Sequence, residues 1–289
     1  MDGPLNAHLK GQVAVVTGAT GGIGKEIARG LARMGAEVII GARDPGRGDA
    51  ARREIVANTG NDAVSVLQID VASVESVRRF ATALKARHPK LNILVNNAGA
   101  WFTDRKESAE GLEMTFATNV LGPYLLTHAL VDVLRAGAPS RVVNVVSSLS
   151  SGYDVSDLQY RARKWDGFKA YGQSKQALRI LTGALARKLE GSGIAVNDAA
   201  PGFVNTDFNR NAHGFMATMI NLSARLMAVS PAKGADTPLW VASAPELGGV
   251  TGRYFEKRRE GDPRFRDPVV ASELERALSA IAAQTRPSA

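Results

Sequence analysis

The sequence predicts an α/β protein with a doubly wound parallel sheet of about seven strands and helices on both faces. Short runs rich in Val, Ile and Leu alternate with longer segments whose apolar residues recur at three- and four-residue spacing, which is typical of βαβ units. A glycine-rich stretch, Gly18–Gly24, follows the first run directly. Runs that are apolar almost throughout also indicate strands buried on both faces.

Seven runs qualify as strands by length and by their content of β-branched residues. They are Val13–Thr17, Glu37–Ile40, Ala63–Leu67, Leu91–Asn96, Arg141–Val146, Ile194–Asn197 and Arg253–Phe255. The clearest helices between them are Gly24–Met34, Val74–Arg87, Gly111–Leu134 and Gly167–Leu189. No linker or internal repeat divides the 289 residues. We therefore predict a single domain over 1–289, with a core over about 9–260 and a looser tail over about 262–289.

Composition excludes several classes of protein. The chain has no cysteine, which excludes disulfides and thiolate catalysis, and its four histidines lack metal-ligand spacing, so we expect no metal site. No apolar run approaches the roughly 18 to 20 residues of a membrane-spanning helix, and residues 1–10 lack the apolar core of a secretory signal. We expect a cytoplasmic protein without a membrane span.

The formal net charge of +8 raises the question of nucleic-acid binding, because basic patches neutralise phosphates. The basic residues are scattered along helical stretches, with Lys257–Arg259 as the densest run. Such runs are typical of solvated helix faces, and a basic surface also attracts anionic small molecules. We therefore expect no nucleic acid as a partner.

The glycine-rich stretch is a candidate phosphate site because it follows a strand and leads into a helix. Glycines let the backbone approach a diphosphate closely at the helix N-terminus. The spacing fits G-x-x-x-G-x-G through Gly18, Gly22 and Gly24, or G-x-x-G-x-x-G through Gly18, Gly21 and Gly24. A tight βα turn with a packing role is the alternative.

Tyr171 and Lys175 are candidates for proton transfer. Residues four apart share one face of a helix, so the ammonium can lie near the phenol. A free phenol has a pKa of about 10, and a nearby positive charge lowers it. Tyr171 can then donate a proton to a carbonyl or accept one from an alcohol. The same spacing also arises by chance on amphipathic helices.

These motifs together resemble the short-chain dehydrogenase/reductase family over about Leu9–Phe255. The similar segments are Asn96-Asn97-Ala98-Gly99 (N-N-A-G), Tyr171-Gly172-Gln173-Ser174-Lys175 (Y-x-x-x-K) and Pro201-Gly202 (P-G). Tyr153–Lys175 is most similar to the retinol-dehydrogenase-like branch, which carries an extra segment before the tyrosine. The resemblance implies a Rossmann-type fold and favours the first of the two glycine spacings.

The resemblance implies a catalytic tetrad of Asn119, Ser148, Tyr171 and Lys175. Ser148 matches the second of the family's paired serines, but its spacing from the preceding strand asparagine is one residue longer than in many relatives, which leaves Ser147 open. Asn119 is expected to hold a water on a proton path from the lysine to solvent. A helix kink or a local backbone hydrogen bond is the alternative for Asn119.

The resemblance also implies the residues that hold the cofactor. They are Gly18, Thr20, Gly21, Gly22, Ile23, Gly24, Arg43, Asp70, Val71, Asn96, Ala98, Gly99, Tyr171, Lys175, Pro201, Gly202, Val204 and Thr206. The family's acidic position after the second strand holds Ala42, and the next residue, Arg43, can pair with a 2′-phosphate. We predict NADP(H) over NAD(H), with Asp44 as the remaining ambiguity. Asp70 and Val71 should border the adenine, with a helix N-cap as the alternative for Asp70.

Several aromatic residues fall in segments that the family uses around its substrate cleft, although aromatic residues more often belong to a core. They are Trp101, Phe102, Tyr153, Trp165, Phe203, Phe208 and Phe215. Asn205–Val229 is the predicted lid. The branch's S-K-x-A-N is here Ser174–Leu178, which ends in leucine, so retinol is one candidate among hydrophobic carbonyls and alcohols.

We therefore expect an NADP(H)-dependent oxidoreductase that transfers a hydride between nicotinamide and a hydrophobic or aromatic ketone, aldehyde or alcohol. The alternative is a regulatory or scaffold protein that binds NADP(H) without catalysis. Relatives use the helices that correspond to Gly111–Leu134 and Gly167–Leu189 for association, which implies a homodimer or homotetramer.

Overall fold

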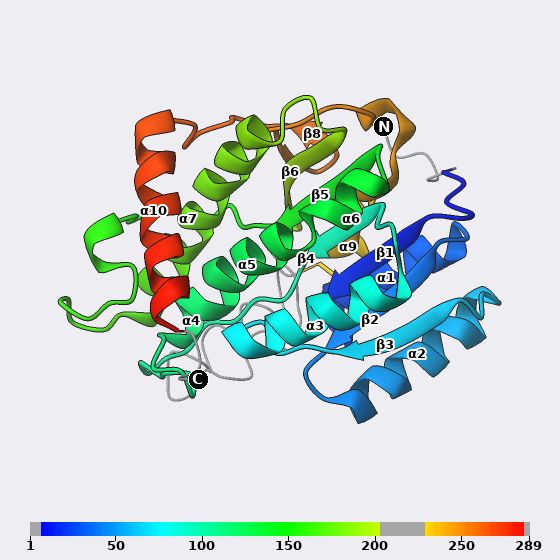
Figure 1. Cartoon of the computed structure of the whole chain (residues 1–289), viewed down its shortest axis with the longest axis horizontal. Helices are drawn as coiled ribbons and strands as arrows, with labels where there is room; N and C mark the ends of the chain where they lie inside the picture. Colours follow the sequence, from blue (N-terminus) through cyan, green and yellow to red (C-terminus); the bar gives the residue numbers. More distant parts are fainter. Residues whose placement is uncertain (1–6, 203–228, 286–289) are drawn as a thin grey trace.

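The computed structural model describes residues 7–202 and 229–285. Their strands form one eight-stranded sheet in the order β3-β2-β1-β4-β5-β6-β7-β8 (Figure 1). The strands are β1 (Val13–Thr17), β2 (Glu37–Ala42), β3 (Val64–Gln68), β4 (Ile93–Asn96), β5 (Ser140–Val145), β6 (Ile194–Ala200), β7 (Tyr254–Glu256) and β8 (Arg259–Glu260). All pairs are parallel except β7–β8. The predicted parallel sheet is confirmed, with one short antiparallel strand more.

Helices cover both faces of the sheet. They are α1 (Gly22–Arg33), α2 (Pro45–Thr59), α3 (Val74–Arg87), α4 (Met114–Phe116), α5 (Gly122–Ala129), α6 (Val131–Ala136), α7 (Gly167–Lys188), α9 (Pro231–Ser243) and α10 (Pro268–Gln284), with the short turns η1 (Ala117–Leu121), η2 (Val155–Asp157) and η4 (Pro245–Leu247). Helices α3, α5, α7 and α10 contribute to one apolar cluster, and α1, α2 and α9 contribute to the other. None of the helices in the described ranges has the length and apolar content that a bilayer crossing requires.

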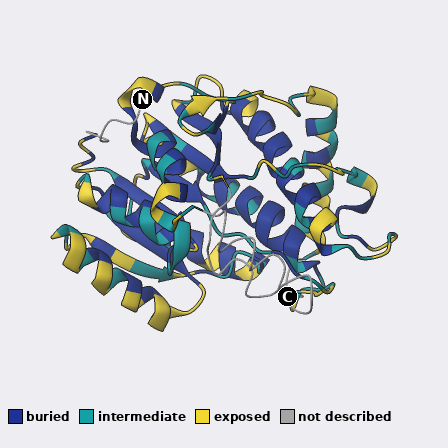
Figure 2. Cartoon of the chain, turned by 180° about the vertical axis from the view of Figure 1, so that it is seen from behind, coloured by how far each residue is buried: buried dark blue, intermediate teal, exposed yellow. Residues whose placement is uncertain are grey.

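Strand β1 contributes to both clusters because successive side chains of a strand point to opposite faces. Val13 and Val15 belong to the α3 side, and Ala14 and Val16 belong to the α1 side. Figure 2 shows buried residues filling the sheet and the helix faces turned toward it, with exposed residues on the outer faces and loops. This two-sided burial explains why the strand sequences are apolar almost throughout.

The winding of the sheet reverses between β1 and β4, which are hydrogen-bonded neighbours. Strands β2 and β3 extend the sheet on one side, and β5 to β8 extend it on the other. The connections leave this point in opposite directions, and ligands of such folds bind outside the carboxyl ends of the strands at such a reversal. The glycine-rich turn follows β1 at this point.

The prediction of one continuous helix over Gly111–Leu134 was wrong. The segment is divided into α4, the π-helical η1, α5 and α6. In η1, the Asn119 side chain bonds the backbone of Ala100, and at Gly122 a Cβ atom would lie 2.3 Å from the carbonyl oxygen of Val71. These contacts with distant segments, rather than local propensity, fix where the helix changes its winding.

The expected loose tail beyond Asp262 was also wrong, because α10 packs along α7 (Figure 1). Asp267 caps α10 by accepting a hydrogen bond from the Val269 N–H at 2.8 Å. Ala271, Leu274 and Leu278 are buried against the α7 side of the core. Helix α10 therefore occupies part of the α7 surface, whereas the oligomeric state stays a prediction.

A buried carboxylate ties the C-terminal segment to the sheet. Asp198 of β6 is fully buried and accepts a hydrogen bond from Thr182 Oγ1 at 2.5 Å. Its other oxygen lies 3.1 Å from Arg266 Nη2 and 4.0 Å from Arg179 Nε. Burial raises the pKa of Asp198 to about 6, although Arg266 and the Thr182 hydrogen bond act in the opposite direction.

Replacing Asp198 by alanine removes the buried counter-ion of Arg179 and Arg266. We expect the free energy of unfolding in urea to fall by about 3–5 kcal/mol, as is typical when one partner of a buried ion pair is removed. The control Glu75→Ala breaks an exposed pair with Arg79 and should cost about 0.5 kcal/mol or less. Equal losses for the two variants would show that Asp198 does not anchor the C-terminal segment.

Candidate functional site

The glycine turn after β1 depends on a close approach between two backbone segments. Gly18 and Gly22 have φ values of +68° and +53°, which side chains rarely adopt. A Cβ atom on Gly24 would lie 2.3 Å from Asn97 Nδ2 and 2.6 Å from Gly18 O. Side chains are therefore excluded from the turn at the three positions of the G-x-x-x-G-x-G spacing.

Hydrogen bonds of Thr17 and Asn97 hold this turn against the end of β4. Neither residue is among the predicted site residues. Thr17 Oγ1 accepts hydrogen bonds from Asn97 N at 3.1 Å and Ala98 N at 3.0 Å. Asn97 Nδ2 donates to Thr17 O at 2.9 Å. A threonine at the end of one strand and an asparagine at the end of another were the available signals in the sequence.

The N-terminus of α1 fits a diphosphate. Its N-cap residue, Gly21, provides no side-chain cap, and the first turn carries no acidic residue. Unpaired N–H groups and the positive end of the helix dipole therefore point out of the turn. Thr20 and Ile23 are half-buried beside this turn. A Cβ atom on Gly21 would meet no protein atom within 4 Å, so the cradle is open at that residue.

The end of β2 carries an available cation. Arg43 is exposed, and among the described residues no ion pair is recorded for it. Asp44 faces α2 instead, where its carboxylate accepts hydrogen bonds from Gly46 N at 2.8 Å and Arg47 N at 3.2 Å. The Asp44 carboxylate is therefore already engaged as the N-cap of α2, which weakens the case that it binds the ribose hydroxyls of NAD(H). Ala42, at the family's acidic position, is buried.

Asp70 and Val71 follow β3 at the same edge of the sheet. Asp70 accepts a hydrogen bond from Ala72 N at 3.0 Å in a local turn. The N-cap of α3 is Ser73, whose hydroxyl accepts from Ser76 N. The helix-cap alternative for Asp70 therefore does not hold. Val71 is half-buried.

Asn96 faces the interior, away from the glycine turn. Its Nδ2 donates to Asn144 Oδ1 at 2.8 Å and to Thr127 Oγ1 at 3.2 Å. The Asn96 side chain therefore supports the sheet, and a contact of Asn96 with the cofactor stays a prediction. Ala98 and Gly99 continue this strand end, and a Cβ atom on Gly99 would lie 3.5 Å from Lys175 Nζ.

Of the two serines that the sequence left open, Ser147 contacts the tyrosine in the structure, and the choice of the catalytic serine stays a prediction. A hydrogen bond links the Ser147 side chain to Tyr171, whereas Ser148 is exposed. Ser147 Oγ also accepts from Leu149 N at 3.1 Å, and Ser147 O accepts from Ser150 Oγ at 2.8 Å. Ser147 lies three residues after Asn144 and Ser148 lies four, so the contact with Ser147 does not need the longer spacing.

Burial dominates the electrostatics of the two titratable groups on α7. Burial raises the pKa of Tyr171 to about 12, and the hydrogen bond with Ser147 only partly opposes it. Burial lowers the pKa of Lys175 to about 8, although the charge of Asp198 acts to raise it. Lys175 Nζ donates to Val145 O at 2.9 Å and lies 5.8 Å from the Tyr171 ring centroid. The expected lowering of the Tyr171 pKa is therefore not produced by the protein alone.

Asn119 is fully buried and uses both ends of its amide. Oδ1 accepts from Ala100 N and Nδ2 donates to Ala100 O, each at 2.9 Å. Nδ2 also donates to Ser174 Oγ at 2.9 Å. These contacts agree with the kink and backbone-bond alternative for the side chain, and the proton-path role stays a prediction.

The remaining predicted residues fall into two groups. Pro201 and Gly202 follow β6 at the same sheet edge, with Gly202 at a φ of +75°. Val204, Thr206, the predicted lid and Phe203, Phe208 and Phe215 lie outside the described residues or, for Val229, at their margin. Within the described ranges, no cluster of three or more His, Asp or Glu side chains could hold a metal ion.

Of the predicted aromatic residues, Trp101 and Phe102 are buried, and Tyr153 and Trp165 are half-buried. Tyr153 packs against the apolar cluster on the α3 side. Trp165 Nε1 donates to Thr103 O at 2.9 Å. Trp101 and Phe102 are therefore enclosed by the protein, whereas Tyr153 and Trp165 keep part of their surface accessible.

Comparison with known proteins gives consistent similarities. Residues 12–214 match the family model described as short chain dehydrogenase. The chain is 37% identical over 279 residues to human retinol dehydrogenase 13, covering 94% of this chain and 84% of the relative. It is 40% identical over 268 residues to mouse polyprenol dehydrogenase, covering 90% and 80%. The Pseudomonas aeruginosa RhlG/NADP active-site complex is similar with a TM-score of 0.69 and 29% identity, covering 92% and 100%.

The close contact at Gly24 gives a test of the glycine turn. In Gly24→Ala, the new Cβ would force Asn97 and Gly18 apart, and we expect the Kd for NADPH to rise by about tenfold or more, equivalent to about 1.4 kcal/mol. Fluorescence titration measures it. Gly248→Ala is the control, because it adds the same methyl group after η4, outside the turn, where the nearest atom to the new Cβ would be Pro245 O at 3.1 Å, and its Kd should stay within about twofold of the wild type. Unchanged binding by Gly24→Ala would separate the turn from the cofactor.

Proposed function

The chain belongs to the short-chain dehydrogenase family, in its retinol-dehydrogenase-like branch, and from this premise we propose that it reduces apolar or aromatic ketones and aldehydes with NADPH, or oxidises the corresponding alcohols with NADP⁺. The proposal rests mainly on one observation: Ser147, Tyr171 and Lys175 lie at the same edge of the sheet as the glycine turn. A packing role for the turn alone would not require these polar groups beside it.

The chain's own groups match the parts of NADP(H). The turn Gly18–Gly24 and the uncapped N-terminus of α1 would hold the diphosphate. Arg43 would pair with the 2′-phosphate, because a guanidinium forms strong charge-assisted hydrogen bonds with phosphate oxygens. Ala98, Gly99 and Pro201-Gly202 would border the nicotinamide side. When bound, the reduced nicotinamide supplies the hydride.

Tyr171 acts as the acid in carbonyl reduction. With a pKa raised to about 12, its phenol is protonated at neutral pH, so it can donate a proton to the carbonyl oxygen as negative charge develops there. Ser147 holds the same oxygen by a hydrogen bond. In the oxidative direction, Tyr171 must accept the proton, and the positive charges of Lys175 and of an oxidised nicotinamide favour the phenolate that this requires.

Lys175 supplies a proton to Tyr171 after the tyrosine has donated its own to the carbonyl oxygen. A pKa of about 8 allows the amine to exchange protons near neutral pH, and its bond to Val145 O holds it one helical turn from Tyr171. Asn119 positions the adjoining backbone at Ala100. The path from Lys175 to solvent would run past Asn119.

The substrate is proposed from the relatives and from the lining of the edge. Retinol and polyprenol, named for two similar proteins, are apolar alcohols. Trp165, just before α7, keeps part of its surface accessible, which suits an apolar or aromatic group. A non-catalytic NADP(H)-binding protein is the second candidate, and only the turnover experiment separates the two.

The direct test is titration of the protein with NADPH and NADH, followed by a panel of aromatic, isoprenoid and short aliphatic carbonyls while nicotinamide absorbance is followed. We expect preferential NADPH binding and turnover of the apolar members. Binding without turnover on the whole panel would favour the non-catalytic candidate. Absence of binding by either nucleotide would overturn the proposal.

The proposed catalytic roles predict that replacing Ser147 lowers kcat, whereas replacing its neighbour Ser148 does not. Tyr171→Phe and Ser147→Ala remove the hydroxyls that serve the reacting oxygen, and kcat should fall by about 10²-fold or more. Ser148→Ala, the matched control, should retain kcat within about twofold because Ser148 is exposed. All three should bind NADPH with near wild-type Kd. Loss of activity in Ser148→Ala with retention in Ser147→Ala would reverse the assignment.

The cofactor preference predicts an effect confined to the phosphorylated nucleotide. In Arg43→Ala, the Kd for NADPH should rise by about tenfold or more, because one charge-assisted contact is lost, while the Kd for NADH stays within about twofold. Arg53→Ala removes the same charge from an exposed site on α2 and should change neither. Equal losses for NADPH and NADH in Arg43→Ala would assign Arg43 to the fold.

A further inference from the structure

The chain between β5 and α7 folds back onto the catalytic helix, and one glutamine holds it there. Residues 153–166 form this pre-tyrosine segment. Gln173, which is 2% exposed, donates from Nε2 to Asp157 O and Leu158 O, each at 3.2 Å. Its Oε1 accepts from Arg163 Nη2 at 2.9 Å. Both ends of the amide are therefore engaged with one segment.

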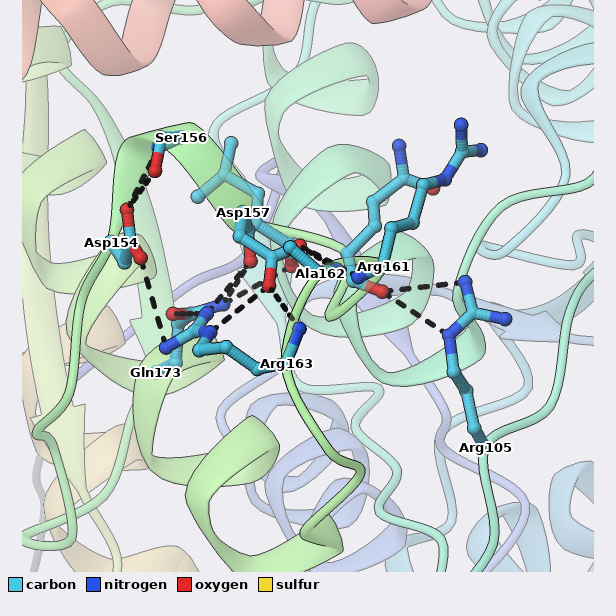
Figure 3. A network of polar contacts seen from close by, with 10 residues as sticks. Arg105, Asp154, Ser156, Asp157, Arg161, Ala162, Arg163 and Gln173 are labelled. Carbon is cyan, nitrogen blue, oxygen red and sulfur yellow. Dashed lines mark hydrogen bonds and ion pairs between the residues drawn. The ribbon is translucent and has the colours of Figure 1, made fainter.

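Asp157 and Arg163 complete a clamp with Gln173 (Figure 3). The Asp157 carboxylate accepts from the backbone N–H groups of Arg161 at 2.6 Å and Arg163 at 3.3 Å, and from Arg163 Nε at 3.0 Å. Arg163 Nη2 also donates to Asp157 O at 2.8 Å. The Arg163 guanidinium, the Asp157 carboxylate and the Gln173 amide therefore satisfy one another's hydrogen-bonding groups and join the loop to α7.

Tyr160 and Trp165 connect the clamp to the chain that follows β4. The Arg163 guanidinium lies over the Tyr160 ring, with its Cζ 4.1 Å from the ring centroid. Tyr160 contacts Trp165 edge-on at a centroid distance of 5.6 Å, and Trp165 Nε1 donates to Thr103 O at 2.9 Å. Tyr160 has a φ of +51°, a conformation that bulky residues adopt only when their surroundings impose it.

The clamp reaches the catalytic helix between its two titratable residues. Residues two apart on a helix project about 160° from one another, so Gln173 points to another side of α7 than Tyr171. The next contacts lie on either side of Gln173: Ser151 N donates to Gly172 O at 3.2 Å, and Tyr153 N donates to Gln176 Oε1 at 3.0 Å. One stretch of α7 thus carries the proton donor and fixes the segment beside it.

We propose that Gln173, with Asp157 and Arg163, is a specificity-determining clamp that holds the pre-tyrosine segment as a wall of the substrate site. The proposal rests on the proposed carbonyl reduction. The chain that leads from Ser147 into the segment bonds Gly172, the residue after Tyr171, through Ser151 N, and the segment ends at Asp166, just before α7. Its half-buried Trp165 would suit a bulky apolar group on the substrate, whereas a small carbonyl would need only Ser147 and Tyr171.

The first test needs no substrate. Arg161, Arg163 and Lys164 place three trypsin-cleavable bonds in the segment. In Gln173→Ala and Asp157→Asn, cleavage at these bonds should accelerate by about tenfold or more relative to the wild type, because buried partners are left unpaired. Mass spectrometry assigns the bonds. Lys169→Ala is the matched control, one turn earlier on α7 with its side chain 74% exposed, and should be cleaved at the wild-type rate.

The second test is a comparison of two substrates of the wild-type enzyme, its bulkiest apolar carbonyl and its smallest. In both clamp variants, KM for the bulky carbonyl should rise by about tenfold or more, while kcat and KM for the small one and the Kd for NADPH stay within about twofold. A merely structural role would lower kcat for both substrates together.

Each other outcome has one meaning. Unchanged cleavage rates in both variants would overturn the clamp, and faster cleavage with an unchanged ratio of the two KM values would overturn its role in specificity. If the wild-type protein reduces no carbonyl, the proposed function fails, and the specificity role fails with it. An active enzyme with unaltered selectivity contradicts the specificity role alone.

Discussion

The hydrogen bonds between Thr17 and Asn97 hold the ends of β1 and β4 together, and the geometry of the candidate site depends on them. The two strands are neighbours at the reversal of the sheet, where their connections diverge and where ligands of such folds bind. The Thr17 hydroxyl and the Asn97 amide fix these ends at hydrogen-bond distance. The narrow spacing requires glycine at Gly18 and Gly24. The same strand end continues to Gly99, beside Asn119 and Lys175, so one contact orders both the phosphate turn and the proton-transfer groups.

Helix α7 is held from two sides, which fixes the direction of its reactive side chains. Toward the sheet, Asn144 Nδ2 donates to Thr182 Oγ1 at 2.8 Å, and Thr182 donates to Asp198. Toward the loops, Gln173 holds the pre-tyrosine segment. Burial and the charge of Asp198 act in opposite directions on the pKa of Lys175. The same interior that positions the helix therefore also sets how readily its amine exchanges protons.

The sequence predicted the strands well because continuous apolar runs bounded by polar residues are a local signal; β1 has the predicted bounds. The chain near Asn119 was predicted less well, because its π-helical turn depends on Ala100 and Val71, which are distant in sequence. Which of Ser147 and Ser148 faces Tyr171 depends on how the chain turns after β5, and a sequence motif does not encode that turn. Helix α2 is not among the predicted helices, although Asp44 at its N-cap and Pro45 after it were usable signals. The clamp joins residues 6 to 16 positions apart through side chains of ordinary type, so no sequence motif marks it.

The central claim is that a hydride passes between the nicotinamide of a cofactor whose diphosphate is held at the glycine turn and a carbonyl carbon beside Tyr171. The most direct measurement uses NADPH deuterated at C4 on one face of the ring, with mass spectrometry of the alcohol formed from an apolar carbonyl. A ring held in one orientation would turn only one of its faces to the substrate, so the account predicts a single deuterium on the carbinol carbon from one of the two labelled forms and none from the other. Alcohol formed without deuterium from either form would contradict it.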